Sequence, residues 1–156
     1  MCGIVGFTGH QSAKDVLIEG LKRLEYRGYD SAGIALQNTT NEELTVVHRV
    51  GKVAGLAEAV EYLNNASPCG IGHTRWATHG APSERNAHPH TSCDNQIAVV
   101  HNGIIENFAE LREQLEARGH KFRSDTDTEV VSHLIEEAYR GNLRDAVAKA
   151  CSQIVG

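Results

Sequence analysis

Short apolar runs recur along the chain, and glycine or a polar cluster ends each of them within a few residues. The first run, Cys2 to Phe7, is typical of a buried strand. No internal repeat, low-complexity stretch or linker divides the sequence. Since 156 residues are enough to bury a substantial core, we expect one compact domain of strands and helices.

The first half of the chain combines strand and helix patterns. Ser12, with Asp15 three residues later, resembles a helix-capping signal. The apolar face of this helix would consist of Val16, Leu17, Leu21 and Leu24. A polar turn separates two strand-like runs, residues 31–37 and 44–50, and predicts a hairpin. The other predicted elements of this half are a helix and a strand, at residues 53–63 and 69–76.

A polar stretch from residue 78 to residue 95 interrupts this pattern. It is longer than about 15 residues, which in compact domains usually indicates a functional or a disordered loop, and we favour function. Residues 96–103 predict a strand that the turn-forming pair Asn102 and Gly103 stops. The spacing of apolar residues then predicts three helices, near residues 105–119, 124–141 and 143–151, while residues 153–156 resemble the beginning of a strand.

Charge and composition exclude several classes of protein. The formal net charge is −5, and the basic residues form no stripe that could bind a phosphate backbone, so nucleic acid is not an expected partner. No apolar stretch approaches the roughly 20 residues of a membrane span, and no secretory signal is present. We therefore expect a cytoplasmic protein that does not bind a membrane. The four cysteines form no CxxC pair, which argues against a zinc finger and a disulfide framework.

Cys2 directly follows Met1. A cysteine here could simply pack as a small apolar residue in the first strand. If Met1 is removed, however, Cys2 carries both a thiol and a free α-amine. An α-amine has a pKa of about 7.7 to 8.0, so at neutral pH it can accept the proton of the thiol and act as a general base. One residue would then supply both the nucleophile and the base.

Four segments support the hypothesis that Cys2 is a nucleophile. They are CGIVG, RGYDSAG, GHTRWATHG and HNGIIEN, which begin at residues 2, 27, 72 and 101. Together they closely resemble the glutaminase domain of the class II glutamine amidotransferases, in order and over essentially the whole chain. Trp76, NAHPH and SDTDTE favour the branch of the family that uses fructose 6-phosphate over the amidophosphoribosyltransferases. Asp125 departs from the glutamate that is common in the family.

The resemblance implies the fold. Periodicity alone does not separate a doubly wound sheet from two antiparallel sheets covered by helices. The family has an α+β fold, a four-layer αββα sandwich of two antiparallel sheets called the N-terminal nucleophile hydrolase fold. We expect residues 1–156 to form this glutaminase domain, with the C-terminal sugar-isomerase domains of the family absent from the chain.

The resemblance also implies the catalytic residues. Cys2 matches the nucleophile, and Arg27 matches the arginine that orients it. The side-chain amide of Asn102 and the backbone N–H of Gly103 match the donors that stabilise the oxyanion, which is usually the largest contribution to catalysis. The alternative for Asn102 and Gly103 is a simple turn at the end of a strand.

Glutamine recognition needs a cation for the α-carboxylate and an anion for the α-ammonium group. Arg75 and Asp127 match the family residues for these roles, and a guanidinium offers two parallel donors to a carboxylate. Their alternatives are a surface ion pair for Arg75 and a first-turn helix acid for Asp127. The remaining candidates for the glutamine site are Trp76, Thr78, His79 and His88. In the family the residue at Trp76 gates the passage of ammonia, although a lone tryptophan is more often core.

The implied reaction is hydrolysis of the side-chain amide of L-glutamine to glutamate and ammonia. In the family, the ammonia converts fructose 6-phosphate to glucosamine 6-phosphate in the C-terminal domains. We expect the isolated domain to be monomeric, the full-length enzyme to be oligomeric, and no metal or organic cofactor to take part.

Three alternatives remain open. The first is the glutaminase domain of another class II enzyme, such as an amidophosphoribosyltransferase. The second is a Cys-His hydrolase in which a loop histidine activates Cys2 or Cys93. The third is a non-catalytic metal-binding module, because five histidines (His73, His79, His88, His90 and His101) lie close to Cys93 in the sequence. Their spacing matches no paired zinc pattern, so we expect these histidines to have structural roles.

Overall fold

The computed structural model describes residues 2–37, 44–63, 67–76 and 81–156. Its strands are β1 (Gly3–Thr8), β2 (Ser31–Gln37), β3 (Leu44–Val50), β4 (Cys69–Arg75), β5 (His90–Thr91) and β6 (Ala98–Val99). Its α-helices are α1 (Ala13–Leu24), α2 (Val53–Val60), α3 (Phe108–Ala117), α4 (Glu129–Ala138) and α5 (Leu143–Cys151). Two short 3₁₀-helices are η1 (Glu25–Arg27) and η2 (Glu84–Asn86).

The main sheet is antiparallel, with the strand order β1-β4-β2-β3. Strands β2 and β3 pair from Ser31 with Val50 to Gln37 with Leu44, which confirms the predicted hairpin. Strand β4 lies between β1 and β2, so its end is enclosed on both sides. Arg75, one of the predicted site residues, is the last residue of β4.

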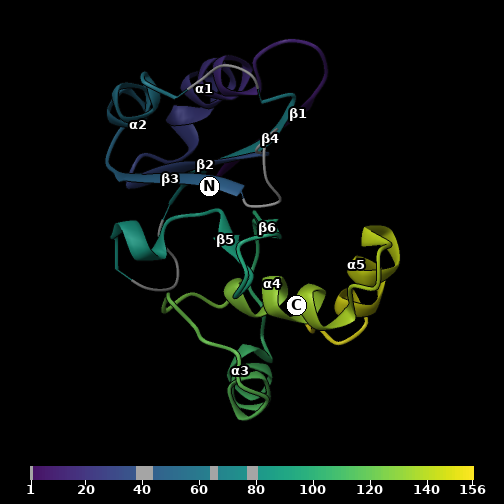
Figure 1. Ribbon diagram of the computed structural model, residues 1–156. Helices are drawn as coiled ribbons and strands as arrows, with labels where there is room; N and C mark the ends of the chain where they lie inside the picture. The colour runs from purple at the N-terminus through teal and green to yellow at the C-terminus, as the bar shows by residue number, and fades with distance from the viewer. Residues whose placement is uncertain (1, 38–43, 64–66, 77–80) are drawn as a thin grey trace.

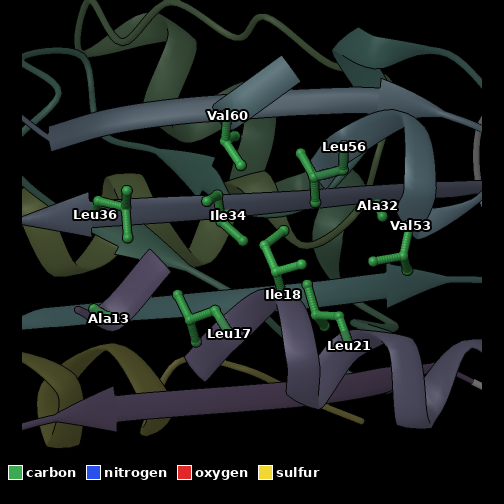
Figure 2. Close-up of a cluster of buried hydrophobic side chains, with 10 residues drawn as sticks. All are labelled: Ala13, Leu17, Ile18, Leu21, Ala32, Ile34, Leu36, Val53, Leu56 and Val60. Carbon is green, nitrogen blue, oxygen red and sulfur yellow. The ribbon is translucent and has the colours of Figure 1, made fainter. Parts of the chain in front are cut away.

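Helices α1 and α2 cover one face of the main sheet (Figure 1). Ser12 caps α1, since its Oγ accepts a hydrogen bond from the backbone N–H of Asp15 at 3.4 Å, as the capping signal predicts. Figure 2 shows the side chains that fill the space between these helices and the sheet, among them Leu17, Ile34 and Leu56, all fully buried. Each such side chain stabilises the fold by about 1.5–3 kcal/mol.

The other face of the main sheet is covered by the second half of the chain (Figure 1). Strands β5 and β6 form a small antiparallel sheet, and α4 packs against it. Helices α3, α4 and α5 share a second core that includes Leu115, Val130 and Leu134. The layers run helices, main sheet, small sheet, helices, which confirms the predicted αββα sandwich.

The two sheets approach each other closely at Gly33 of β2. A Cβ atom on this residue would overlap the backbone carbonyl oxygen of His88, which precedes β5. Glycine is therefore required here because another residue's backbone occupies the place of a side chain. The close approach brings the histidine segment before β5 against the centre of the main sheet.

Three predictions at the level of elements are wrong in detail. The strand predicted at residues 96–103 is limited to Ala98 and Val99, and the stretch 78–95 contains η2 and β5 rather than loop alone. Residues 153–156 form no strand; instead Val155 accepts a hydrogen bond from the N–H of Glu106 and donates one to the Asn107 side chain. In each case the partner strand, which no local pattern reveals, decides whether an extended segment joins a sheet. Among the described residues, no helix has the length and hydropathy needed to cross a bilayer.

Candidate active site

Cys2 is positioned by the pairing of β1 with β4. Gly3 lies opposite Thr74, which brings Cys2 to the end of β4. There the half-buried thiol accepts a hydrogen bond from the N–H of Trp76, at 3.2 Å, and donates one to its carbonyl oxygen, at 3.6 Å. Among the described residues, no histidine nitrogen is hydrogen-bonded to this sulfur, and a histidine-activated Cys2 is therefore not favoured.

A cavity of about 310 Å³ opens beside the Cys2 thiol. Six segments that lie far apart in the sequence form its wall. They are the beginning of the chain, the end of η1, the end of β4, the residue His88 before β5, the residues after β6 and the residues before α4. Of the predicted site residues, it is lined by Cys2, Arg27, Arg75, Trp76, His88, Asn102, Gly103 and Asp127. Thr78 and His79 lie outside the described residues.

Asn102 is held between Cys2 and His73. Its side-chain Nδ2 donates a hydrogen bond to the carbonyl oxygen of Cys2 at 3.2 Å, and its Oδ1 lies 2.8 Å from Nε2 of His73. Burial lowers the pKa of His73 to about 4, so the ring is neutral at pH 7. An amide oxygen can only accept, and Nε2 of His73 is therefore the protonated nitrogen. This hydrogen bond turns the amide N–H₂ group of Asn102 toward Cys2.

The backbone bends at Gly103, although neither Asn102 nor Gly103 has a positive φ. A bend here is compatible with both the turn and the donor role of this pair. The geometry of this pair is set by the contacts of the Asn102 side chain with β4 and with Cys2.

Three histidine rings lie in contact at the wall of the cavity. The rings of His73 and His88 are parallel, with centroids 4.3 Å apart, and the ring of His90 lies 4.4 Å from that of His88. Burial and the neighbouring histidines hold the pKa of His88 well below its ordinary value. Burial also lowers the pKa of His90, to about 3. These rings are neutral at pH 7, and they form a scaffold rather than a charged site.

Arg75 and Asp127 bring charges of opposite sign to the same cavity. Both are buried, with 4% and 5% of their surface exposed. One carboxylate oxygen of Asp127 accepts a hydrogen bond from the backbone N–H of Ile105 at 2.7 Å, which fixes its position. A surface ion pair, the alternative for Arg75, is excluded by this burial. Asp127 does lie just before α4, so the positive end of that helix also stabilises it.

The segment that carries Asp127 is anchored by Glu129. The Glu129 carboxylate accepts hydrogen bonds from the N–H groups of Arg123 and Ser124 and from the Ser124 hydroxyl, at 2.6 to 2.7 Å. Burial opposes ionisation, but the hydrogen bonds from His133, Ser124 and Arg123 outweigh it and lower the pKa of Glu129 to about 2. A permanent charge at Glu129 therefore holds the turn that leads to the cavity.

Arg27 and Trp76 lie at the mouth of the cavity. Arg27 ends η1, and the next residue, Gly28, approaches the end of β4 so closely that a Cβ would lie 2.8 Å from the backbone of Arg75. Trp76 is 48% exposed and packs edge-to-face on Tyr29, with ring centroids 5.4 Å apart. Trp76 is thus a rim residue and not the core residue that a lone tryptophan usually is.

The structure adds residues that the sequence analysis did not assign to the site. These additional lining residues are His73, His101, Ile104, Thr126 and Thr128. His73 and His101 lie inside the motif segments that begin at residues 72 and 101, which is the signal that could have identified them. Nδ1 of His101 lies 3.2 Å from the hydroxyl of Thr128, which connects two walls of the cavity.

A second cavity, of about 1010 Å³, is larger than the cavity at Cys2, but no arginine or lysine is among its described lining residues. It lies under β6 and against α4 and α5, and its lining is mainly apolar, with Ile97, Val131 and Ile135 as examples. It shares His101 with the cavity at Cys2. The gathering of a thiol, an amide and two opposite charges sets the smaller cavity apart.

The chain is similar to known proteins in sequence and in structure. The model of a family described as glutamine amidotransferase domain matches residues 54–147. The chain is 61% identical over 156 residues to the glutamine--fructose-6-phosphate aminotransferase (isomerizing) of Thermus thermophilus, covering 100% of this chain and 26% of that protein. It is 54% identical over 158 residues to the protein of the same name from Pyrococcus horikoshii, and the match covers 100% of this chain and 26% of that protein. The chain thus spans about a quarter of the length of these curated relatives.

Two solved structures share the fold. One is the glutamine phosphoribosylpyrophosphate amidotransferase of B. subtilis in complex with ADP and GMP, with a TM-score of 0.80 and 30% identity. The match covers 100% of this chain and 33% of the chain in that structure. The other is described as the allosteric regulatory enzyme of purine biosynthesis, with a TM-score of 0.81 and 30% identity. The match covers 99% of this chain and 33% of that chain.

Proposed function

Because this chain belongs to the glutamine amidotransferase family, we propose that it hydrolyses the side-chain amide of L-glutamine with Cys2 as the nucleophile. The observation that carries this proposal is the single cavity in which Cys2, Asn102, Arg75 and Asp127 meet. These residues supply a thiol, a neutral donor and one charge of each sign. That set matches the groups that free glutamine presents.

Removal of Met1 is the first requirement of the mechanism. It leaves Cys2 with a free α-amine, which accepts the thiol proton because its pKa lies close to neutral pH. No histidine is needed as the base. This is supported by the neutral, buried state of His73 and His88 and by their contacts with one another.

Binding of glutamine places the two charged groups on its α-carbon against different walls of the cavity. The Arg75 guanidinium donates to the α-carboxylate, and the Asp127 carboxylate accepts from the α-ammonium group. Arg27, Thr78, His79 and His88 complete the contacts with the substrate and with Cys2. The burial of Arg75 and Asp127 supports these roles, because charges excluded from water interact strongly with a charged ligand.

The chemistry then proceeds in two steps. The Cys2 thiolate attacks the side-chain carbonyl carbon, and the developing oxyanion is stabilised by Nδ2 of Asn102 and the N–H of Gly103. The C–N bond breaks, the α-ammonium group of Cys2 protonates the leaving nitrogen, and ammonia departs from a glutamyl thioester. Water, deprotonated by the same amine, hydrolyses the thioester to glutamate and restores the thiol.

The use of the ammonia is proposed from the relatives. They are named glutamine--fructose-6-phosphate aminotransferases, and about three quarters of their length lies outside the match. We propose that the full-length enzyme transfers the ammonia to fructose 6-phosphate and forms glucosamine 6-phosphate in C-terminal sugar-isomerase domains, with residues 1–156 as the glutaminase domain. Trp76, at the rim, would gate the ammonia. We also propose a cytoplasmic location, because a sugar phosphate is charged and does not cross a membrane.

The proposal is tested by covalent labelling with 6-diazo-5-oxo-L-norleucine, a glutamine analogue that alkylates the nucleophile. We expect one adduct, on Cys2, in the chain from which Met1 has been removed. The three other cysteines, Cys69, Cys93 and Cys151, serve as internal controls because they are also free thiols. A chain with one residue left in front of Cys2 should be unlabelled and should release no glutamate. An adduct on Cys93, or undiminished turnover by the blocked chain, would contradict the proposal.

A further inference from the structure

A second group of chemically reactive side chains lies outside the cavity at Cys2. Its members are Cys93, in the turn between β5 and β6, His120, which follows α3, and His133 and Glu136, which lie three residues apart on α4. Sγ of the cysteine, one ring nitrogen of each histidine and one carboxylate oxygen all lie within 4.8 Å of one another. The proposed glutaminase reaction uses none of them. We call these four residues the Cys93 cluster.

Five of the six distances within the Cys93 cluster agree with a tetrahedral arrangement around one ion. The two Nδ1 atoms are 3.3 Å apart, and Sγ of Cys93 lies 3.6 and 3.7 Å from them. Oε2 of Glu136 lies 3.1 Å from Nδ1 of His120 and 3.2 Å from Nδ1 of His133. Four donors bound tetrahedrally to Zn²⁺ would be separated by about 3.3 Å between two nitrogens or nitrogen and oxygen, and about 3.6 Å between nitrogen and sulfur.

Hydrogen bonding alone does not account for this arrangement. A neutral imidazole has at most one N–H at Nδ1, which points at one acceptor in the ring plane. Each Nδ1 here instead faces three other donor atoms, the other Nδ1 included, at 3.1 to 3.7 Å. All four atoms converge on one point between them, which is the place of a shared cation.

The opposite ring nitrogens support the same conclusion. Nε2 of His120 lies 3.2 Å from Oε1 of Glu137, and Nε2 of His133 lies 3.7 Å from Oε1 of Glu129. Histidines that bind a metal commonly donate their other N–H to a carboxylate, which fixes the tautomer and makes the ligand more basic. Glu137 is in turn held by Nε of Arg118 at 3.0 Å. His120 therefore has the outer hydrogen-bond partner of a metal ligand, whereas Nε2 of His133 only faces the Glu129 carboxylate from beyond hydrogen-bond distance.

We propose that Cys93, His120, His133 and Glu136 bind one Zn²⁺ ion in a closed, structural site. One thiolate, two imidazoles and one carboxylate suit zinc, and four protein ligands leave no open position for a substrate. The ion would join the β5–β6 turn, the end of α3 and the middle of α4. Figure 1 shows β5 and β6 lying directly beside α4. Because Asp127 precedes α4, the site also supports the helix that carries a wall of the cavity at Cys2.

This proposal revises the expectation that no metal takes part. The ligand candidates expected from the sequence are the histidines that lie closest to Cys93 in the chain, and their spacing matches no paired zinc pattern. Of these, His73 and His88 stack on each other, and the ring of His90 lies tilted against that of His88. The structure replaces them with His120 and His133, which lie 27 and 40 residues after Cys93.

The test measures metal content and metal affinity of the purified chain. We expect about one zinc per chain by inductively coupled plasma mass spectrometry, and less than a tenth of that in Cys93→Ala and His120→Ala. Cys151→Ala and His10→Ala are the matched controls, since both residues are exposed and outside the cluster, and they should keep the metal. Full zinc content in Cys93→Ala would overturn the proposal.

A second measurement keeps the proposal testable if a ligand variant does not fold. Co²⁺ added to the metal-free parent chain should give the intense near-ultraviolet charge-transfer band of a cobalt–thiolate bond and the visible bands of a tetrahedral ion. The substitution Glu137→Gln, which removes only the outer partner of His120, should weaken zinc binding by about 10- to 100-fold. The matched control is Glu113→Gln, which changes an exposed glutamate on α3. A parent chain that binds neither Zn²⁺ nor Co²⁺, or a cobalt spectrum without the thiolate band, would overturn the proposal.

Discussion

At the scale of single residues, Asn102, the proposed oxyanion donor, is held in position by two hydrogen bonds. Its Oδ1 contacts the buried, neutral His73, and its Nδ2 contacts the backbone of Cys2. A donor that is already oriented needs no reorganisation when negative charge develops on the substrate. The histidine thus acts through Asn102 and does not touch the reacting atoms in our mechanism.

Substitution Asn102→Ala tests this role. We expect kcat for glutamine hydrolysis to fall about 10²- to 10³-fold, because one oxyanion donor is lost, while KM changes little. The measurement is steady-state glutamate production, with Gln114→Ala on the exposed side of α3 as the control. A large rise in KM with kcat unchanged would assign Asn102 to substrate binding instead.

At the scale of elements, the contact between β2 and the segment before β5 sets the distance between the two sheets. Gly33 permits this contact because His88 occupies the space where a side chain would lie. The same contact stacks His88 on His73 of β4. The packing of the sheets and the burial of the histidines therefore have one common cause.

The substitution Gly33→Ala should separate the sheets. We expect it to lower the free energy of unfolding by about 1–3 kcal/mol, the usual cost of overpacking, and to reduce labelling of Cys2. Gly55→Ala on α2 is the matched control. Nothing lies within 4 Å of its added Cβ, so it should stabilise the chain by about 0.5–1 kcal/mol. Urea denaturation of the two variants measures both changes, and equal effects would contradict the close approach.

The buried histidines also predict a dependence of stability on pH. The folded-state pKa of His73, about 4, lies below the ordinary value of 6.5. Between these values the unfolded chain binds a proton that the folded chain does not, so the free energy of unfolding falls as the pH is lowered. For His73 alone the loss is on the order of 3 kcal/mol by pH 4.

Denaturation of the parent chain and of His73→Gln at a series of pH values measures this contribution. A glutamine side chain at position 73 does not titrate and can still donate a hydrogen bond to Asn102. The free energy of unfolding of the His73→Gln variant should therefore fall less on acidification than that of the parent chain. The exposed His10 provides the control, because His10→Gln should leave the slope unchanged. Parallel curves for His73→Gln and the parent chain would show that His73 is not buried in its neutral form.

At the scale of the whole molecule, the site lies where the two halves of the chain meet. Arg75 belongs to the main sheet, which packs on α1 and α2, and Cys2 directly precedes strand β1 of that sheet. Asn102 and Asp127 come from the half that holds α3, α4 and α5. Each half has its own core. The cavity therefore exists only while both cores are packed.

Substitutions that weaken either core should lower the thermal stability of the whole chain, and Cys2 labelling should be lost when the chain unfolds. Leu17→Ala in the first core and Leu134→Ala in the second each remove a fully buried side chain, with an expected cost of about 2–5 kcal/mol. For each variant, the temperature at which Cys2 labelling is lost should match the midpoint of thermal unfolding. Labelling that survives the unfolding of one core would show that the halves are independent.

Local features of this protein follow from the sequence alone. Local sequence patterns predict the cap at Ser12, the hairpin and the helices on either side of it. They can do so because each of these features depends on residues within a few positions of one another. The motifs around Cys2, Arg75, Asn102 and Asp127 were equally visible because each is a short run of residues. The αββα arrangement was expected from resemblance, since periodicity left it open.

Tertiary structure decided what depends on segments that are distant in the sequence. The contact of His73 with Asn102, the close packing at Gly33 and the convergence of Cys93 with His120 and His133 each join residues from 27 to 55 positions apart. The same holds for the short length of β6, because a strand persists only as far as its partner does. Sequence patterns record which face of an element is apolar, but the burial that neutralises a histidine or assembles four ligands arises only when those faces meet.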